Sequence, residues 1–220
     1  MMLASLFVDA LRFIPDNAHL LLDKAVETAK LAFTALGISL LIAMPIGLWL
    51  GHKHRGLTFA LGVSSVGRAL PTIALIGLFI AWLGVGFWNV TAALVVLGIP
   101  PILTNSYFAV DGVDRDVVEA ARGMGLTERQ IVTGVELPLG LPLLLAGVRT
   151  AAVFVVATAT IAGIAGVQAG GLGQIMANPV LYRQPGVLAA AFVVAAMALL
   201  TNFALGLAQH AASRRMAPRA

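Results

Sequence analysis

The stretch EAARGMGLTERQIVTGVELP, residues 119–138, is a polar island between long apolar runs. Asp116 and Glu119 are separated by the spacing of a capping box, which predicts that a helix begins there. Gly125 is expected to end this helix, because glycine readily adopts the left-handed conformation that closes many helices. The apolar stripe of the predicted helix consists of Val117, Ala121 and Met124.

A second helix is predicted directly after the glycine. Thr127 and Gln130 repeat the capping arrangement, and Ile131 and Val135 provide an apolar stripe. Pro138 is expected to close this helix, because the residue before a proline avoids the helical region. The stretch therefore predicts a helix–glycine–helix elbow that presses its apolar side into another surface.

The composition around the elbow is that of a membrane protein. Of the 220 residues, 60% are hydrophobic and only 11% are charged, whereas soluble chains carry about 25% charged residues. The net charge of +4 is scattered and accompanies no nucleic-acid-binding motif, so we expect no nucleic-acid partner. The absence of cysteine excludes disulfides and thiolate metal sites, and the histidines lack ligand spacing, so no metal site is predicted.

Five membrane spans are predicted, at about residues 26–51, 57–83, 87–110, 141–166 and 187–209. The second span contains Leu70-Pro71 and is expected to be bent or unwound there. Residues 1–18 are too short to cross a bilayer and are interpreted as an amphipathic helix on the outer face. One domain, residues 1–220, is expected. It comprises an external segment (1–24), a cytoplasmic coupling loop (111–138), a cytoplasmic tail (210–220) and the membrane part.

The distribution of positive charge predicts an external N-terminus and a cytoplasmic C-terminus. With that orientation nine Lys and Arg residues lie on the cytoplasmic side and four lie outside, as the positive-inside rule requires. His52 and His54 are interpreted as part of the cytoplasmic basic collar. The nine residues are Lys53, Arg55, Arg115, Arg122, Arg129, Arg149, Arg214, Arg215 and Arg219, and the four are Arg12, Lys24, Lys30 and Arg183.

The elbow resembles the EAA signature of binding-protein-dependent ABC importer permeases. The match comprises Glu119-Ala120-Ala121, Gly125 and Val135-Glu136-Leu137-Pro138, with Val135 where the family has isoleucine. The resemblance extends over roughly residues 30–205 and implies an all-α integral membrane protein whose elbow docks into a groove on an ATPase subunit. The residues implied in this coupling are Glu119, Ala120, Ala121, Gly125, Leu137 and Pro138.

Three further segments are similar to the branch of this family that imports glycine betaine, choline and carnitine. They are LPTIALIG (70–77), IPPILTNSYFAVDGVD (99–114) and AGVQAGGLG (165–173). The resemblance implies a non-enzymatic permease of the bacterial inner membrane that binds no cofactor. Its expected partners are cytoplasmic ATPase subunits carrying ATP and Mg, a second identical or homologous permease, and an external substrate-binding protein. Methionine, a sulfonate or another small metabolite remains an alternative cargo, and a self-contained secondary transporter is an alternative class.

Several residues have two readings that the sequence leaves open. Glu119 either caps a helix or contacts the ATPase, and Gly125 either stops a helix or lets the partner approach closely. Arg68 is interpreted as the one deep charge, with a structural or gating role or contact with a substrate carboxylate, or else it snorkels to the cytoplasm. Further pathway candidates are Thr72, Asn105 and Tyr107. Asn105 and Tyr107 are favoured, because an amide and an aromatic face suit a methylated ammonium.

Overall fold

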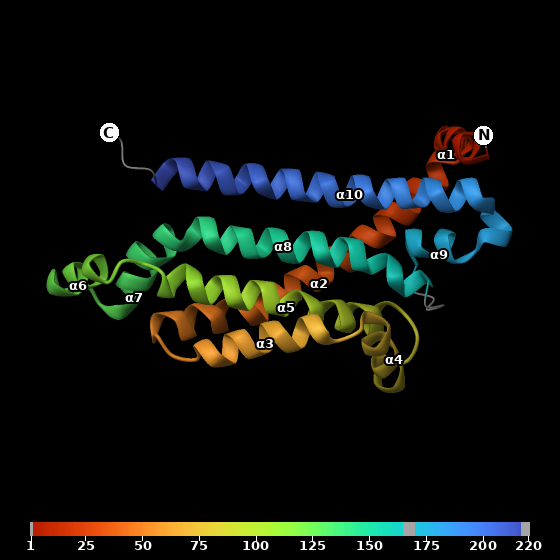
Figure 1. Ribbon diagram of the computed structural model, residues 1–220. Coiled ribbons are helices and arrows are strands. Elements are labelled where there is room, and N and C mark those ends of the chain that lie inside the picture. Colours follow the sequence, from red (N-terminus) through yellow and green to blue (C-terminus); the bar gives the residue numbers. More distant parts are fainter. Residues whose placement is uncertain (1, 165–169, 217–220) are drawn as a thin grey trace.

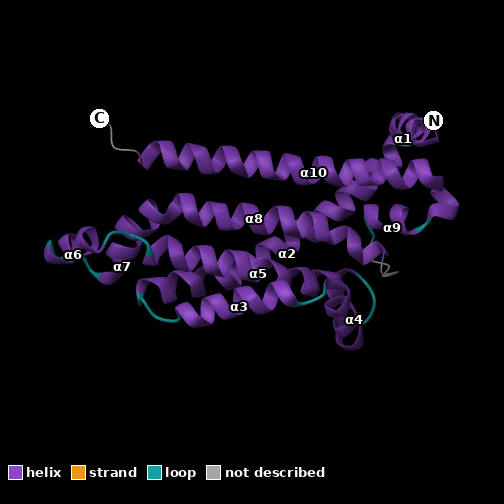
Figure 2. Ribbon diagram, in the orientation of Figure 1, coloured by secondary structure: helices purple, strands orange, loops and turns teal. Residues whose placement is uncertain are grey.

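The computed structural model describes residues 2–164 and 170–216, and these residues form helices without any strand (Figures 1 and 2). The elements are α1 (Met2–Asp16), α2 (Ala18–His52), α3 (Leu57–Ala69), α4 (Thr72–Leu83), α5 (Phe87–Asp111), α6 (Arg115–Gly123), α7 (Glu128–Ile131), a π-helix η1 (Val132–Glu136), α8 (Leu137–Ile164), α9 (Leu172–Ala177) and α10 (Pro179–Met216).

Five crossings of the membrane are accounted for if one of them is broken. Four helical stretches are long and apolar enough to span a bilayer, and α3 with α4 passes the same test as a pair bent by 92°. The break falls at Leu70 and Pro71, which both adopt extended backbone conformations. Proline disfavours a helical conformation at the preceding residue, so the predicted interruption at this dipeptide is confirmed.

The bundle is arranged around α5, which packs against α2, α3, α4 and α8. Glycines let α8 approach α5 closely. A Cβ atom at Gly140 would overlap the carbonyl of Ala109, and one at Gly147 would lie 2.9 Å from the carbonyl oxygen of Pro101. Small residues at such crossings allow backbones to touch, which favours helix association in a bilayer. The two helices are therefore in direct backbone contact along this seam.

The N-terminal end of α2 holds the glycine-rich turn before α9. Gly171 adopts a φ of +89°, and its amide donates to Oε2 of Glu27 at 2.7 Å. The amide of Leu172 donates to Oγ1 of Thr28 at 2.9 Å, and Lys24 Nζ donates to Oε1 of Gln174 at 3.0 Å. These contacts make the segment a structural turn. Residues 165–169 of the AGVQAGGLG segment lie outside the described residues.

The two ends of the bundle carry different elements. The helix expected at residues 1–18 is present as α1, which packs against α10, with the rings of Phe7 and Phe192 6.0 Å apart. This end of the molecule also contains α9, whereas α6, α7 and the C-terminal end of α10 lie at the opposite end (Figure 1). The N-terminal helix and the C-terminal end of α10 thus lie at opposite ends of the bundle, as an odd number of membrane crossings requires.

The prediction that Pro138 ends a helix is wrong. Helix α7 continues through η1 directly into α8, and the amide of Leu137 donates to the carbonyl of Val132 five residues earlier. Proline lacks an amide hydrogen, but it is tolerated in the first turn of a helix, and the π-turn before it starts α8 on a new hydrogen-bonding register. The elbow is therefore joined to the fourth span without a loop.

Candidate functional site

Helix α6 is capped by Asp114, not by Asp116. Oδ1 of Asp114 accepts the amide of Asp116 at 2.9 Å, and Asp116 lies inside the first turn. The predicted box between Asp116 and Glu119 is therefore wrong. Val113 and Val118 flank the cap, and both are buried in one apolar cluster, an arrangement that fixes how the chain enters the helix. The helix therefore starts two residues earlier than the spacing of acidic residues indicated.

Gly125 ends α6, as predicted. Its φ is +85°, its amide donates to the carbonyl of Arg122 at 3.0 Å, and the amide of Leu126 donates to that of Ala121 at 3.3 Å. This pair of bonds is a Schellman motif, which requires a left-handed residue where Gly125 stands. Apart from its two chain neighbours, no atom of the described residues lies within 4 Å of where a Cβ atom on Gly125 would stand.

The apolar stripe predicted for α6 is divided between two faces. Ala121 is buried as expected, but its buried neighbour is Val118. Val117 is 43% exposed and Met124 is 74% exposed, and Ala120 is exposed between them. At helical spacing these three residues form an outward apolar strip, which we call the α6 strip. The sequence pattern does not show which of the adjacent residues Val117 and Val118 turns inward, because that depends on where the helix is capped.

The second half of the elbow matches the prediction. Thr127 and Gln130 form a reciprocal capping box, with the Thr127 amide 2.8 Å from Oε1 of Gln130. Ile131 is fully buried, and Val135 packs against it in the cluster below α6 and α7. These contacts give the elbow a small apolar core of its own.

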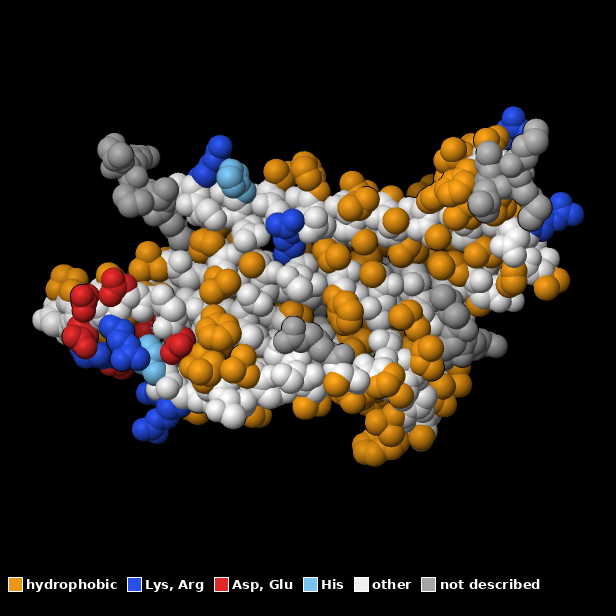
Figure 3. All heavy atoms as spheres, viewed as in Figure 1, with side chains coloured by type: hydrophobic (Ala, Val, Ile, Leu, Met, Phe, Trp, Pro, Cys, Tyr) orange, Lys and Arg blue, Asp and Glu red, His pale blue; other side chains and the backbone are white. Residues whose placement is uncertain are grey.

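An ion pair closes the elbow across its two helices. Arg122 Nε and Nη2 donate to the two carboxylate oxygens of Glu128 at 3.0 and 3.1 Å. The hydrogen bond from Arg122 lowers the pKa of Glu128, and the same bond raises the pKa of Arg122. Acidic and basic side chains are gathered at this end of the molecule beside a histidine (Figure 3).

His52 anchors the elbow to α2. Its side chain is only 10% exposed, with Nδ1 2.8 Å from Oε2 of Glu136 and Nε2 3.1 Å from Oε2 of Glu128. His52, interpreted from the sequence as part of the cytoplasmic basic collar, instead lies between two glutamates. His54 is more exposed and pairs with Asp111 at the end of α5, 2.8 Å away. A buried carboxylate requires a partner, so Glu136 on the apolar side of its helix was the sequence signal for this contact.

The coupling residues expected from the resemblance are brought to the two sides of the elbow. Glu119 and Ala120 are exposed on α6, and Ala121 lies underneath. Gly125 is at the bend, and Leu137 and Pro138 are half-buried at the start of α8. Glu119 and Ala120 are thus exposed on α6, and of these two Ala120 belongs to the α6 strip, whereas Leu137 and Pro138 connect the elbow to the bundle.

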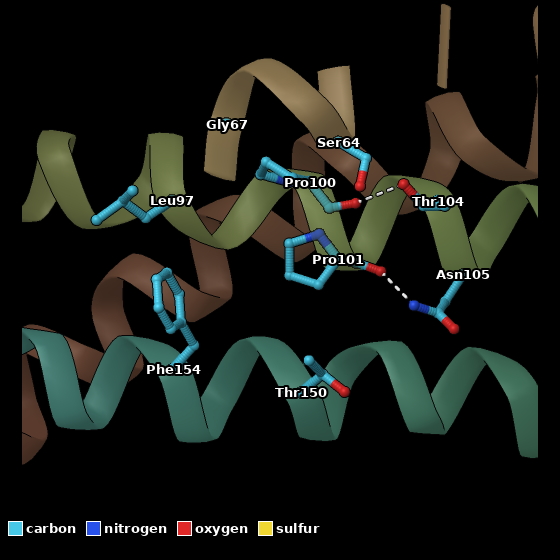
Figure 4. A pocket seen from close by; sticks show the side chains of 9 residues that line it. All are labelled: Ser64, Gly67, Leu97, Pro100, Pro101, Thr104, Asn105, Thr150 and Phe154. Carbon is cyan, nitrogen blue, oxygen red and sulfur yellow. Dashed lines mark hydrogen bonds between the residues drawn. The ribbon is translucent and has the colours of Figure 1, made fainter. Parts of the chain in front are cut away.

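A cavity of about 320 Å³ lies between α3, α5 and α8 (Figure 4). Asn105 lines it and donates to the carbonyl of Pro101 at 2.8 Å. The described residues that line it include neither Thr72, which starts α4, nor Tyr107, which is buried with 2% exposure. The side chain of Arg68 lies outside the described residues. The lining residues are Ser64, Gly67, Leu97, Pro100, Pro101, Thr104, Asn105, Thr150 and Phe154.

Arg149 lies well inside α8 and not close to the start of its span. It follows Leu137 by 12 residues, or about 18 Å along the helix axis. Its Nε donates to Oδ1 of Asn202 at 2.7 Å, and Nη1 lies 3.4 Å from Oε1 of Gln209, both on α10. Arg149 therefore joins α8 to α10, a pairing that the sequence pattern did not indicate.

Comparison with known proteins identifies the class to which this architecture belongs. Residues 43–218 match the family model for the inner membrane component of binding-protein-dependent transport systems. The chain belongs to this family. It is thus a multi-pass inner membrane permease subunit, and the self-contained secondary transporter is set aside.

The relatives of this permease cover nearly all of its length. It is 35% identical to a carnitine transport permease of Listeria monocytogenes, over 94% of this chain and 93% of the relative. It is 32% identical to a choline transport system permease of Bacillus subtilis, over 90% and 91%. An osmoprotectant import permease of Salmonella typhimurium is 32% identical over 78% of this chain and 81% of its own length.

The fold of this permease is that of a solved importer. An inward-facing structure of the MetNI methionine ABC transporter superposes with a TM-score of 0.77 at 23% identity, over 90% of this chain and 98% of the other. A second crystal form gives a TM-score of 0.73 at 24% identity, over 89% and 97%. The all-α fold of the importer type is therefore confirmed.

Proposed function

We propose that this permease imports quaternary ammonium osmoprotectants such as glycine betaine, carnitine or choline. The observation that carries the proposal is the similarity over almost the whole chain to permeases named for carnitine and choline. The fold alone is shared with a methionine transporter, so it supports an importer without specifying the cargo.

The elbow is proposed to receive the force of ATP hydrolysis from a separate cytoplasmic ATPase. The α6 strip supports this role, because Val117 and Met124 expose apolar surface at the end of the protein that also carries the charged side chains. Exposed apolar surface of this kind, rimmed by polar groups, is typical of a protein interface. The ATPase subunits would carry ATP and Mg, and their closure would draw two elbows together and reorient the attached helices.

The cavity between α3, α5 and α8 is proposed to be part of the substrate pathway. Phe154 offers an aromatic face and Asn105 an amide to the lining of the cavity, and an aromatic face attracts a methylated ammonium group. A single bundle provides half of a pathway, so a second permease, identical or homologous, would complete it about a two-fold axis. An external binding protein would deliver the substrate to the end that carries α1 and α9.

Uptake measurements test the proposed cargo. The permease is expressed with its ATPase and binding protein in a host lacking osmoprotectant importers, and uptake of radiolabelled glycine betaine, carnitine, choline and methionine is compared. We expect uptake of at least one of the three ammonium compounds, and growth rescue by it at high osmolarity. Uptake of methionine without uptake of the other three would refute the proposal.

A further inference from the structure

Three elements meet at the side chain of His52. The residue is the last of α2, Glu136 is the last of η1, and Glu128 is the first of α7. The imidazole lies between the two carboxylates, with Nδ1 2.8 Å from Glu136 and Nε2 3.1 Å from Glu128. Among the ion pairs of the described residues, the two formed by His52 are those that join the elbow to α2.

Both ring nitrogens of His52 can donate at once to two ionised carboxylates only when the imidazole is charged. Ionised carboxylates only accept hydrogen bonds, so each ring nitrogen that faces one must carry a hydrogen, and both do so only in the imidazolium form. Glu136 is 1% exposed, and a buried carboxylate is stabilised when it is paired with an opposite charge. The His52–Glu136 contact is therefore a buried ion pair whose loss would leave a carboxylate without a partner.

The same network reaches α6. Glu128 accepts from His52 on one side and from Arg122 on the other, so α6, α7, η1 and α2 are linked in one chain of charged contacts. Lys53 also acts on Glu128 electrostatically. The neighbouring His54 faces Asp111 of α5 and takes no part in this chain.

We propose that His52 is a positioning residue for transport: it fixes the elbow against α2 so that movement of the elbow displaces the first span. The peptide chain already joins the elbow to α5 and α8, and the histidine extends the mechanical connection to a third helix. This inference rests on the proposed docking of the elbow to an ATPase. It concerns the bundle side of the elbow, away from the α6 strip.

The test uses the whole complex of permease, ATPase and binding protein in proteoliposomes. The variants are His52→Ala, His52→Gln and His52→Arg, and His54→Asn is the matched control, because asparagine tolerates the positive φ of His54. We expect His52→Ala and His52→Gln to lower the amount of glycine betaine transported per ATP hydrolysed by at least fivefold, with the ATPase still bound. His52→Arg, which keeps a positive charge and several hydrogen-bond donors, should restore most of the glycine betaine transported per ATP hydrolysed. His54→Asn should leave this ratio unchanged.

A second readout does not depend on the cargo. Hydrogen–deuterium exchange of amides 126–137 in the purified permease should become faster in His52→Gln than in the wild type and remain unchanged in His54→Asn. An unchanged exchange pattern would overturn the proposal, as would transport that falls only in proportion to membrane abundance. If the wild type carries no glycine betaine, the proposed cargo fails, and the exchange measurement decides the role of His52 alone.

Discussion

Substituting Gly125 tests whether the shape of the elbow couples ATP hydrolysis to transport. The residue has a φ of +85°, and a Cβ atom added there would meet no atom of the described residues within 4 Å, its two chain neighbours aside. Steric overlap inside the permease therefore contributes nothing, and the penalty is that of a left-handed backbone, about 1–2 kcal/mol. This penalty lowers the ratio of correctly shaped to misshaped elbows by about 5- to 30-fold.

Gly123 supplies the matched control, because a Cβ atom there also meets nothing within 4 Å and its φ is not positive. We expect Gly125→Ala to reduce uptake and binding-protein-stimulated ATPase activity by about 5- to 30-fold, and Gly123→Ala to reduce neither. Gly125→Val should be worse, because a β-branched residue tolerates positive φ poorly. Gly125→Asn separates the two roles of the glycine. Uptake above that of Gly125→Ala would indicate that the left-handed conformation matters, and uptake as low as that of Gly125→Ala would indicate that a partner approaches the residue closely.

Activity is normalised to the amount of permease in the membrane, measured by immunoblotting. A penalty of about 1–2 kcal/mol leaves the bundle inserted, so abundance should stay near that of the wild type. Full uptake and full stimulated ATPase activity in Gly125→Val would refute the assignment of the elbow as the coupling element. A parallel fall in abundance and activity would reduce Gly125 to a folding residue.

Three further predictions concern other parts of the chain. Arg68→Ala should lower uptake more than membrane abundance, since residue 68 directly follows Gly67, which lines the cavity; equal losses in the two measurements would contradict a pathway role. Ser213→Cys, the only thiol in a chain without cysteine, should resist an impermeant maleimide in intact cells, whereas labelling would place the C-terminus outside. Because Arg122 lowers the pKa of Glu128, their ion pair should stabilise the elbow above pH 4.5, the ordinary value, and be lost as pH falls through the lowered pKa. Acid unfolding should therefore be less steep in Glu128→Gln, and an identical acid limb would refute this contribution.

Local sequence rules predicted the elements whose signals are short-range. The capping box of Thr127 and the stop at Gly125 were found because their partners lie within a few residues. The break at Pro71 was found because proline restricts its own neighbour. Hydrophobic run length gave the number of crossings.

The same rules failed where a distant contact or an unusual turn decides the outcome. Pro138 does not end its helix, because a π-turn accommodates it. Nothing near His52 indicates that Glu136, 84 residues away, will bury beside it. The partners of Arg149, Asn202 and Gln209, lie 53 and 60 residues away in the sequence, beyond the reach of local rules. For His52 and Arg149 the sequence pattern lacked the pairing of helices in space, and for Pro138 it lacked the π-turn.

The glycine seam between α5 and α8 has a consequence for the timing of transport. Packed helices slide past one another by small changes in the side chains between them, but at Gly140 the two backbones touch, and at Gly147 the backbone of α8 lies against the carbonyl of Pro101 and the side chain of Asn105. Helices α5 and α8 adjoin the elbow at one end, and further along both helices line the cavity. A displacement of the elbow therefore reaches the cavity in the same kinetic step, and fluorophores at the two places would report a single rate constant.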